Sequence, residues 1–125
     1  MEINDITGII IEESINIHKS IGPGLLESVY EEILCYRLVK RALFVERQKP
    51  IPDFFEEVRM DIGFRADLIV EQSVVVEIKS IETIAPVHPK VLLTYLRLSD
   101  KRVGLIINFN EVVLKNGIKR VICTQ

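Results

Sequence analysis

Residues 63–80 read GFRADLIVEQSVVVEIKS, and this stretch decides the fold. It contains two runs rich in aliphatic and β-branched residues, which meet at Gln72 and Ser73. Such runs around a short polar turn predict a β-hairpin. Because side chains alternate along a strand, Glu77 and Lys79 should share one face of the second strand with Val75, opposite to Val74, Val76 and Ile78.

Hydrophobic spacing and turn residues predict the other elements. Near the N-terminus, apolar residues recur at steps of three and four until Gly22-Pro23-Gly24, which predicts a helix that ends there. The nearly unbroken apolar run at 103–109 is typical of a strand buried on both faces. The expected helices are 5–21, 25–41 and 89–98, and the expected strands are 43–50, 54–60, 63–71, 73–80, 103–109, 112–115 and 119–123. This order predicts an α/β fold, a central mixed β-sheet flanked by helices.

Length and composition exclude several classes of protein. The chain has 125 residues, of which 48% are hydrophobic and 27% charged, which predicts a single domain over 1–125 and excludes global disorder. No apolar run approaches the roughly 18 residues of a membrane span, and the acidic start MEINDITG is unlike a signal peptide. The two cysteines show neither a CxxC pair nor zinc spacing, and nothing indicates an oxidising compartment. We therefore expect a cytoplasmic protein without a membrane partner.

Charge is unevenly distributed along the chain. Residues 1–62 carry seven basic and twelve acidic side chains, whereas residues 63–125 carry nine basic and six acidic ones. A polyanion such as nucleic acid would meet the C-terminal half more favourably. The alternative is random scatter, because net charge indicates partners only weakly.

Three charged residues stand inside the hairpin strands, where a core residue is expected: Asp67, Glu77 and Lys79. Burying such groups is costly unless they are paired or bind a cation. Residues equidistant from a hairpin turn face each other, so Asp67 should lie near Glu77 or Lys79. Two carboxylates and a backbone carbonyl form a hard oxygen site that suits Mg²⁺ or Mn²⁺, which would support phosphodiester hydrolysis. The alternative is a cross-strand ion pair on a solvated face.

Four further residues have both a functional and a structural interpretation. Glu27 begins the second helix, where the helix dipole favours an acid, but it could also be a metal or water ligand. Tyr30 lies three residues further on the same helix face and could contact a phosphate or pack in the core. His18 and His88 have no partner at zinc spacing, which favours structural or capping roles.

The stretch Gly24-Leu-Leu-Glu27-Ser-Val-Tyr30 resembles the signature of the GxxExxY protein family. Five stretches follow that family's order and spacing over nearly the whole chain: IHKSIGPGLLESVYEEIL, FRADLIV, VVVEIKS, PVHPKVLLTYL and VGLIINFN. The family is placed within the PD-(D/E)XK nuclease-like superfamily. The resemblance therefore implies a restriction-endonuclease-like core, with a four-stranded mixed sheet flanked by helices.

The resemblance also implies roles for individual residues. Asp67 is the first acid of the superfamily motif, and Glu77 and Lys79 form its E-x-K. Asp67 and Glu77 would bind Mg²⁺ or Mn²⁺ together with the carbonyl of Ile78. Lys79 would position the attacking water. Glu27 matches the helical acid that precedes the sheet.

One position departs from the family pattern, because Val91 stands where a glutamine is usual, whereas His88 matches. We expect a metal-dependent nuclease that acts on DNA or RNA, and five side chains that meet the nucleic acid: Tyr30, Arg65, His88, Lys90 and Arg97. The alternative is a catalytically weak or inactive nuclease-fold module that binds nucleic acid or a protein partner, as the loss of the glutamine suggests. A homodimer is a further expectation.

Overall fold

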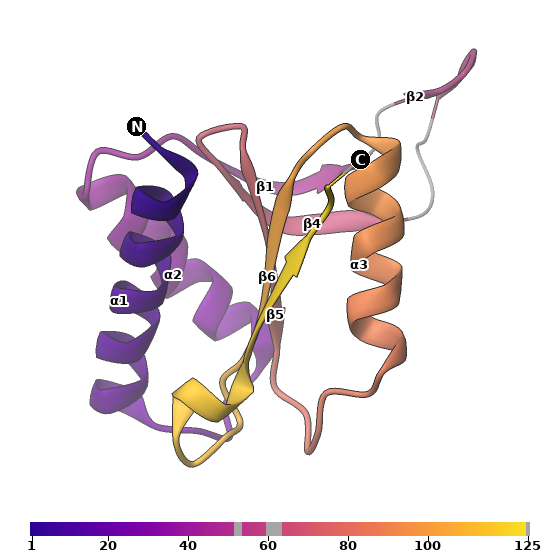
Figure 1. The fold of residues 1–125 in the computed structure, drawn as a ribbon. Helices are drawn as coiled ribbons and strands as arrows, with labels where there is room; N and C mark the ends of the chain where they lie inside the picture. Colours follow the sequence, from indigo (N-terminus) through magenta and orange to yellow (C-terminus); the bar gives the residue numbers. More distant parts are fainter. Residues whose placement is uncertain (52–53, 60–63, 125) are drawn as a thin grey trace.

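The computed structural model describes residues 1–51, 54–59 and 64–124. A five-stranded sheet lies between two helices on one face and one helix on the other (Figure 1). The elements follow one another in the order α1 (Ile3–Ile21), α2 (Glu27–Lys40), β1 (Val45–Pro50), β2 (Phe54–Phe55), β3 (Val58–Arg59), β4 (Arg65–Val70), β5 (Val74–Lys79), α3 (Val87–Leu98), β6 (Val103–Asn108), the short 3-10 helix η1 (Leu114–Gly117) and β7 (Ile118–Ile122).

The strands of the central sheet pair in the order β1-β4-β5-β6-β7. Neighbouring strands are antiparallel except β5 and β6, which run parallel and are connected through α3. A parallel pair needs such a crossover because the chain must return to the same end of the sheet. Every residue of β6 is buried, which confirms the strand expected from the apolar run. The mixed sheet flanked by helices confirms the expected fold class and is consistent with a restriction-endonuclease-like core.

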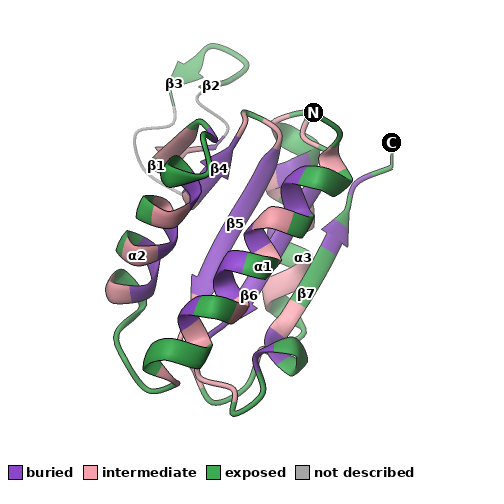
Figure 2. Cartoon of the chain, turned by 90° about the vertical axis from the view of Figure 1, so that its left-hand side faces the viewer, coloured by how far each residue is buried: buried purple, intermediate pink, exposed green. Residues whose placement is uncertain are grey.

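Alternation along β5 divides the core into two layers. Val76 and Ile78 pack among the buried residues of α1 and α2, while Val75 packs with Leu92 and Leu96 of α3. Figure 2 shows β5 and β6 buried along their length beneath the first two helices. The central strands are thus covered on both faces, so a charged residue on β5 must lie near the end of the strand or find a partner.

The three expected helices are confirmed, each within two residues of its expected bounds. The second helix starts late because the Tyr30 hydroxyl holds the preceding turn: it donates to the Gly22 carbonyl at 2.7 Å and accepts the Leu25 N–H at 3.1 Å. Pro89 lies in the first turn of the third helix. Backbone N–H groups there have no hydrogen-bond partner within the helix, so a proline costs no helical hydrogen bond. Among the described residues, no helix has the length and apolar character needed to cross a membrane.

Two expected strands are wrong. Instead of one strand over 54–60, β2 and β3 form a small hairpin of its own, which turns at Glu56 with a left-handed φ of 56° and stands apart from the central sheet (Figure 1). Met60 lies outside the described residues. Instead of a strand over 112–115, the chain forms η1, because this single turn carries Leu114 into the core.

Candidate active site

The turn between β4 and β5 places Asp67 beside Glu77. It has three residues, 71–73, one more than the sequence predicted, and both strands pair symmetrically about its centre. The last paired residues of this ladder are Leu68 and Val76. The sequence left two possible neighbours of Asp67 open, and the observed register selects Glu77.

Beyond that last pair, side chains take over the hydrogen bonds between the two strands. Asp67 Oδ2 accepts the N–H of Ile78 at 2.7 Å, and Glu77 Oε1 accepts the N–H of Asp67 at 3.3 Å. Backbone N–H groups that point at a carboxylate oxygen fix its orientation. The hairpin therefore holds both carboxylates at the point where its ladder opens.

The environment disfavours the charged form of both carboxyl groups. Burial, followed by the charge of Asp67, raises the pKa of Glu77 to about 8. Burial also raises the pKa of Asp67, although hydrogen bonds from Ile78 and Gln48 oppose the change. The charge of Lys79 lowers both pKa values without cancelling the increase. A cation bound between the carboxylates would favour their charged forms.

Glu27 brings a third acid to the same end of the sheet. Its Oε2 accepts the N–H of Ser80 at 3.1 Å, and Ser80 Oγ donates to the carbonyl of Leu25 at 2.6 Å. These two bonds tie the start of α2 to the residue that follows β5. After burial and the charge of Asp67, the charge of Glu27 also raises the pKa of Glu77, so these acids lie within electrostatic range.

A small pocket of about 90 Å³ lies beside Glu77, and Lys79, His88 and Val91 line it. His88 Nδ1 accepts the N–H of Ala85 at 3.1 Å. In the neutral ring this bond leaves the proton on Nε2, where it can be donated to a ligand. Val91 gives the pocket an apolar wall at the position where the resemblance expects a glutamine.

Tyr30 does not lie where it was expected to meet nucleic acid. It is fully buried, and its ring stacks on Phe109 with ring centroids 4.4 Å apart. Its hydroxyl is occupied by the turn between Gly22 and Leu25. The expected phosphate contact is therefore corrected to a structural role, which places the start of α2.

The three expected basic contacts are exposed. Arg65 precedes Asp67 by two residues on β4, and its Nη1 donates to the carbonyl of Gln48 at 3.0 Å. Lys90 and Arg97 lie seven residues apart on α3, so they share one face of that helix. Arg65 thus lies on the same strand as Asp67, two residues before it, whereas Lys90 and Arg97 extend a basic surface along α3.

The sequence did not point to Gln48, which contacts Asp67, or to Glu31, which Gln48 links to it. Gln48 Nε2 donates to Asp67 Oδ1 at 3.1 Å and to Glu31 Oε1 at 2.7 Å. Arg47 Nη2 donates to the other oxygen of Glu31 at 3.0 Å. One signal for Glu31 was present, because it follows Glu27 by four residues and so lies on the same helix face. No sequence pattern indicated Gln48.

The donor set suits a small divalent ion that keeps part of its hydration shell. Within residues 1–51, 54–59 and 64–124, no group of three or more His, Cys, Asp and Glu side chains is arranged to hold a metal ion. Asp67 and Glu77 supply two hard oxygen ligands. Proteins usually bind Mg²⁺ through one or two carboxylates, with water and substrate phosphate completing the shell. The residues present therefore fit such an ion.

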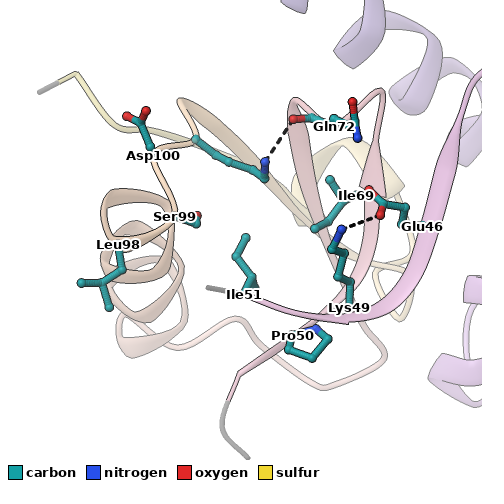
Figure 3. A pocket seen from close by; sticks show the side chains of 10 residues that line it. Glu46, Lys49, Pro50, Ile51, Ile69, Gln72, Leu98, Ser99 and Asp100 are labelled. Atoms are coloured by element: carbon teal, nitrogen blue, oxygen red, sulfur yellow. Dashed lines mark hydrogen bonds and ion pairs between the residues drawn. The ribbon is translucent and has the colours of Figure 1, made fainter. Parts of the chain in front are cut away.

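A larger pocket of about 330 Å³ lies at the other end of α3 (Figure 3). Lys49 contacts Glu46 at 2.6 Å, and Lys101 donates to the carbonyl of Gln72 at 3.1 Å. None of the expected site residues is among the described residues that line this pocket. It therefore lies apart from the candidate site.

Comparison with known proteins identifies one family. A family model of the PD-(D/E)XK nuclease superfamily matches residues 4–121. No curated protein and no solved structure matches the chain. The matched residues include the β4–β5 hairpin with its two carboxylates, the second and third helices, and all five strands of the central sheet up to residue 121. The chain therefore belongs to the PD-(D/E)XK nuclease superfamily.

Proposed function

We propose that this protein is a metal-dependent nuclease of the GxxExxY family that hydrolyses phosphodiester bonds in DNA or RNA. One observation carries the proposal: two carboxylates, Asp67 and Glu77, are fixed side by side although their environment disfavours their charge. Two acids buried together either keep a proton or bind a compensating cation, and a cation would let both carry their charge. The chain belongs to a nuclease superfamily, so such a cation would serve phosphodiester hydrolysis.

Asp67, Glu77 and the Ile78 carbonyl would hold Mg²⁺ or Mn²⁺. When bound there, the ion would polarise a phosphate oxygen and lower the pKa of a water. Lys79 shares a pocket with Glu77 and would hold the attacking water. Glu27, already bonded to the end of β5, would orient the same water or a water on the ion.

Nucleic acid would approach across α3 and the start of β4, where Arg65 is exposed. Arg65, Lys90 and Arg97 would contact phosphates, since backbone contacts dominate the affinity for nucleic acid. His88 would donate a hydrogen bond from Nε2 to a phosphate in the small pocket. Contacts with phosphates do not distinguish one base from another, which favours binding without sequence preference.

A cleavage assay with single- and double-stranded DNA and RNA tests the proposal. We expect cleavage that requires Mg²⁺ or Mn²⁺, and we expect Asp67→Asn and Lys79→Ala each to lower the rate by about 100-fold or more. Asp100→Asn and Lys119→Ala are matched controls, because both residues are exposed and lie outside the site. Cleavage that is untouched by the first two variants would reject the assignment.

A second candidate function rests on Val91. The apolar wall that it gives to the small pocket removes a hydrogen-bonding group beside Glu77 and Lys79. The chain would then be a weakly active or inactive module that binds nucleic acid or a protein. In the same assay, bound nucleic acid that stays uncleaved at every metal concentration would favour this second function.

We further propose that the chain acts as one domain over 1–125 in the cytoplasm and pairs as a homodimer. The family match over 4–121 supports the single domain. Two copies would present two sites, which lets both strands of a duplex be reached. Sedimentation velocity checks this, and a purely monomeric boundary at all concentrations would contradict it.

A further inference from the structure

The hydrogen-bond ladder between β1 and β4 has a gap opposite the site. Arg47 pairs with Leu68 and Lys49 pairs with Ala66, but between these pairs Gln48 and Asp67 are not paired. Gln48 has a φ of 50° in the middle of its strand. A residue other than glycine rarely adopts this left-handed conformation, and such backbone strain is concentrated at functional sites.

The side chain of Gln48 explains what this conformation achieves. Its amide nitrogen has two hydrogens, and both reach carboxylates: Oδ1 of Asp67 at 3.1 Å and Oε1 of Glu31 at 2.7 Å. Only the nitrogen end of an amide can donate, so two carboxylates also fix which way the amide is turned. The left-handed backbone of Gln48 thus directs its side chain toward Glu31 and Asp67.

Glu31 anchors the other side of this arrangement. It is buried, and Arg47 binds its second oxygen through Nη2 at 3.0 Å and Nε at 3.2 Å. Consecutive hydrogen bonds therefore link the side chains of Arg47, Glu31, Gln48 and Asp67, from β1 through α2 to the hairpin. Such a chain restricts the rotation of the Gln48 amide.

We propose that Gln48 is a positioning residue, which fixes the orientation of the Asp67 carboxylate as a metal ligand. Asp67 is then held at both oxygens, at Oδ2 by the Ile78 N–H and at Oδ1 by Gln48. Outer partners that orient a ligand typically change metal affinity or activity by about 10- to 100-fold when they are removed. The inference rests on the proposed function, because it requires Asp67 to bind an ion.

Mn²⁺ binding to the full chain, measured by calorimetry without nucleic acid, tests the inference. Gln48→Gly removes two hydrogen bonds but relieves the left-handed backbone, and because these effects oppose each other the unfolding midpoint in EDTA should change little. The dissociation constant for Mn²⁺ should rise by about 10-fold. Gln72→Gly is the matched control, because Gln72 is an exposed glutamine with a φ of 54° at the opposite end of the hairpin.

A second variant covers the case in which Gln48→Gly does not fold. Gln48→Asn tolerates the left-handed backbone, but its side chain is one methylene too short to reach both carboxylates. Equal Mn²⁺ affinity in the wild type and the folded variants would overturn the inference and leave the proposed function standing. A wild-type chain that binds no Mn²⁺ would overturn the proposed function and the inference together.

Discussion

Glu77 is a buried carboxyl whose ionisation is coupled to the stability of the metal-free protein. Burial and the charge of Asp67 raise its pKa from 4.5 to about 8. Between these values the folded chain holds a proton that the unfolded chain has released. The stabilising contribution of Glu77 is therefore fully present below about pH 4.5 and is lost as pH rises through about 8.

We predict that, in EDTA, the wild-type chain loses free energy of unfolding between about pH 5 and about pH 8.5. Glu77→Gln keeps the shape of the side chain but cannot ionise, so the loss should be smaller in this variant. Some loss should persist, because burial raises the pKa of Asp67 in the same direction. Urea denaturation at the two pH values measures the difference.

Glu32→Gln serves as the control for this prediction, since Glu32 is an exposed residue of α2. Its pH dependence should match that of the wild type. If Glu77→Gln retained the full loss of stability with pH, the buried Glu77 carboxyl would not be its source.

Sequence analysis found the charged residues of the hairpin because they interrupt strands that are otherwise apolar. It could not find Gln48, whose contact with Asp67 depends on a kink between two strands and on the approach of α2. The expected phosphate contact of Tyr30 was wrong, because the burial of an aromatic side chain depends on packing between elements that are distant in sequence. Its stacking partner Phe109 immediately follows β6.

At the scale of elements, one close contact sets the distance between α3 and the sheet. A Cβ atom added at Gly104 of β6 would lie 2.8 Å from Leu92 Cδ2. Glycine here lets the helix approach the parallel strands. Since α3 also carries His88 and Val91 into the small pocket, this contact helps to define the candidate site.

We predict that Gly104→Ala destabilises the chain by about 1–3 kcal/mol, because overpacking displaces α3. Adding Leu92→Ala should relieve the clash, so the two substitutions together should cost less than the sum of their separate effects. Urea denaturation of both single variants and the double variant checks this. Gly8→Ala is the control: Gly8 is exposed on α1 with no atom near the added Cβ, and alanine there should stabilise the helix.

The elements that were predicted well are those with a sustained pattern. The apolar run of β6 and the spaced isoleucines of α1 determine their own conformation, since each has an extended surface to bury. The segment 112–115 is short, and its apolar residues do not share a face: Leu114 is buried, whereas Val112 is 85% exposed. Such local turns depend on how β6 is connected to β7.

At the scale of the whole molecule, an ion that binds only the folded chain should stabilise all of it. We predict that Mg²⁺ raises the midpoint of thermal unfolding, with a shift that grows with the logarithm of its concentration. Asp67→Asn should remove most of this shift, and Asp100→Asn should leave it intact. Differential scanning calorimetry measures the shift, and an equal response in all three proteins would show that Mg²⁺ acts elsewhere.

The symmetric three-residue turn between β4 and β5 limits how this gene can change in length. An in-frame insertion or deletion of one codon that shifted one strand by one residue against the other would move its alternate side chains to the opposite side of the sheet. Such a chain could still fold, yet its two acids would no longer meet. Among descendants of this sequence, the length of that turn should therefore distinguish those that have kept the chemistry from those that have lost it.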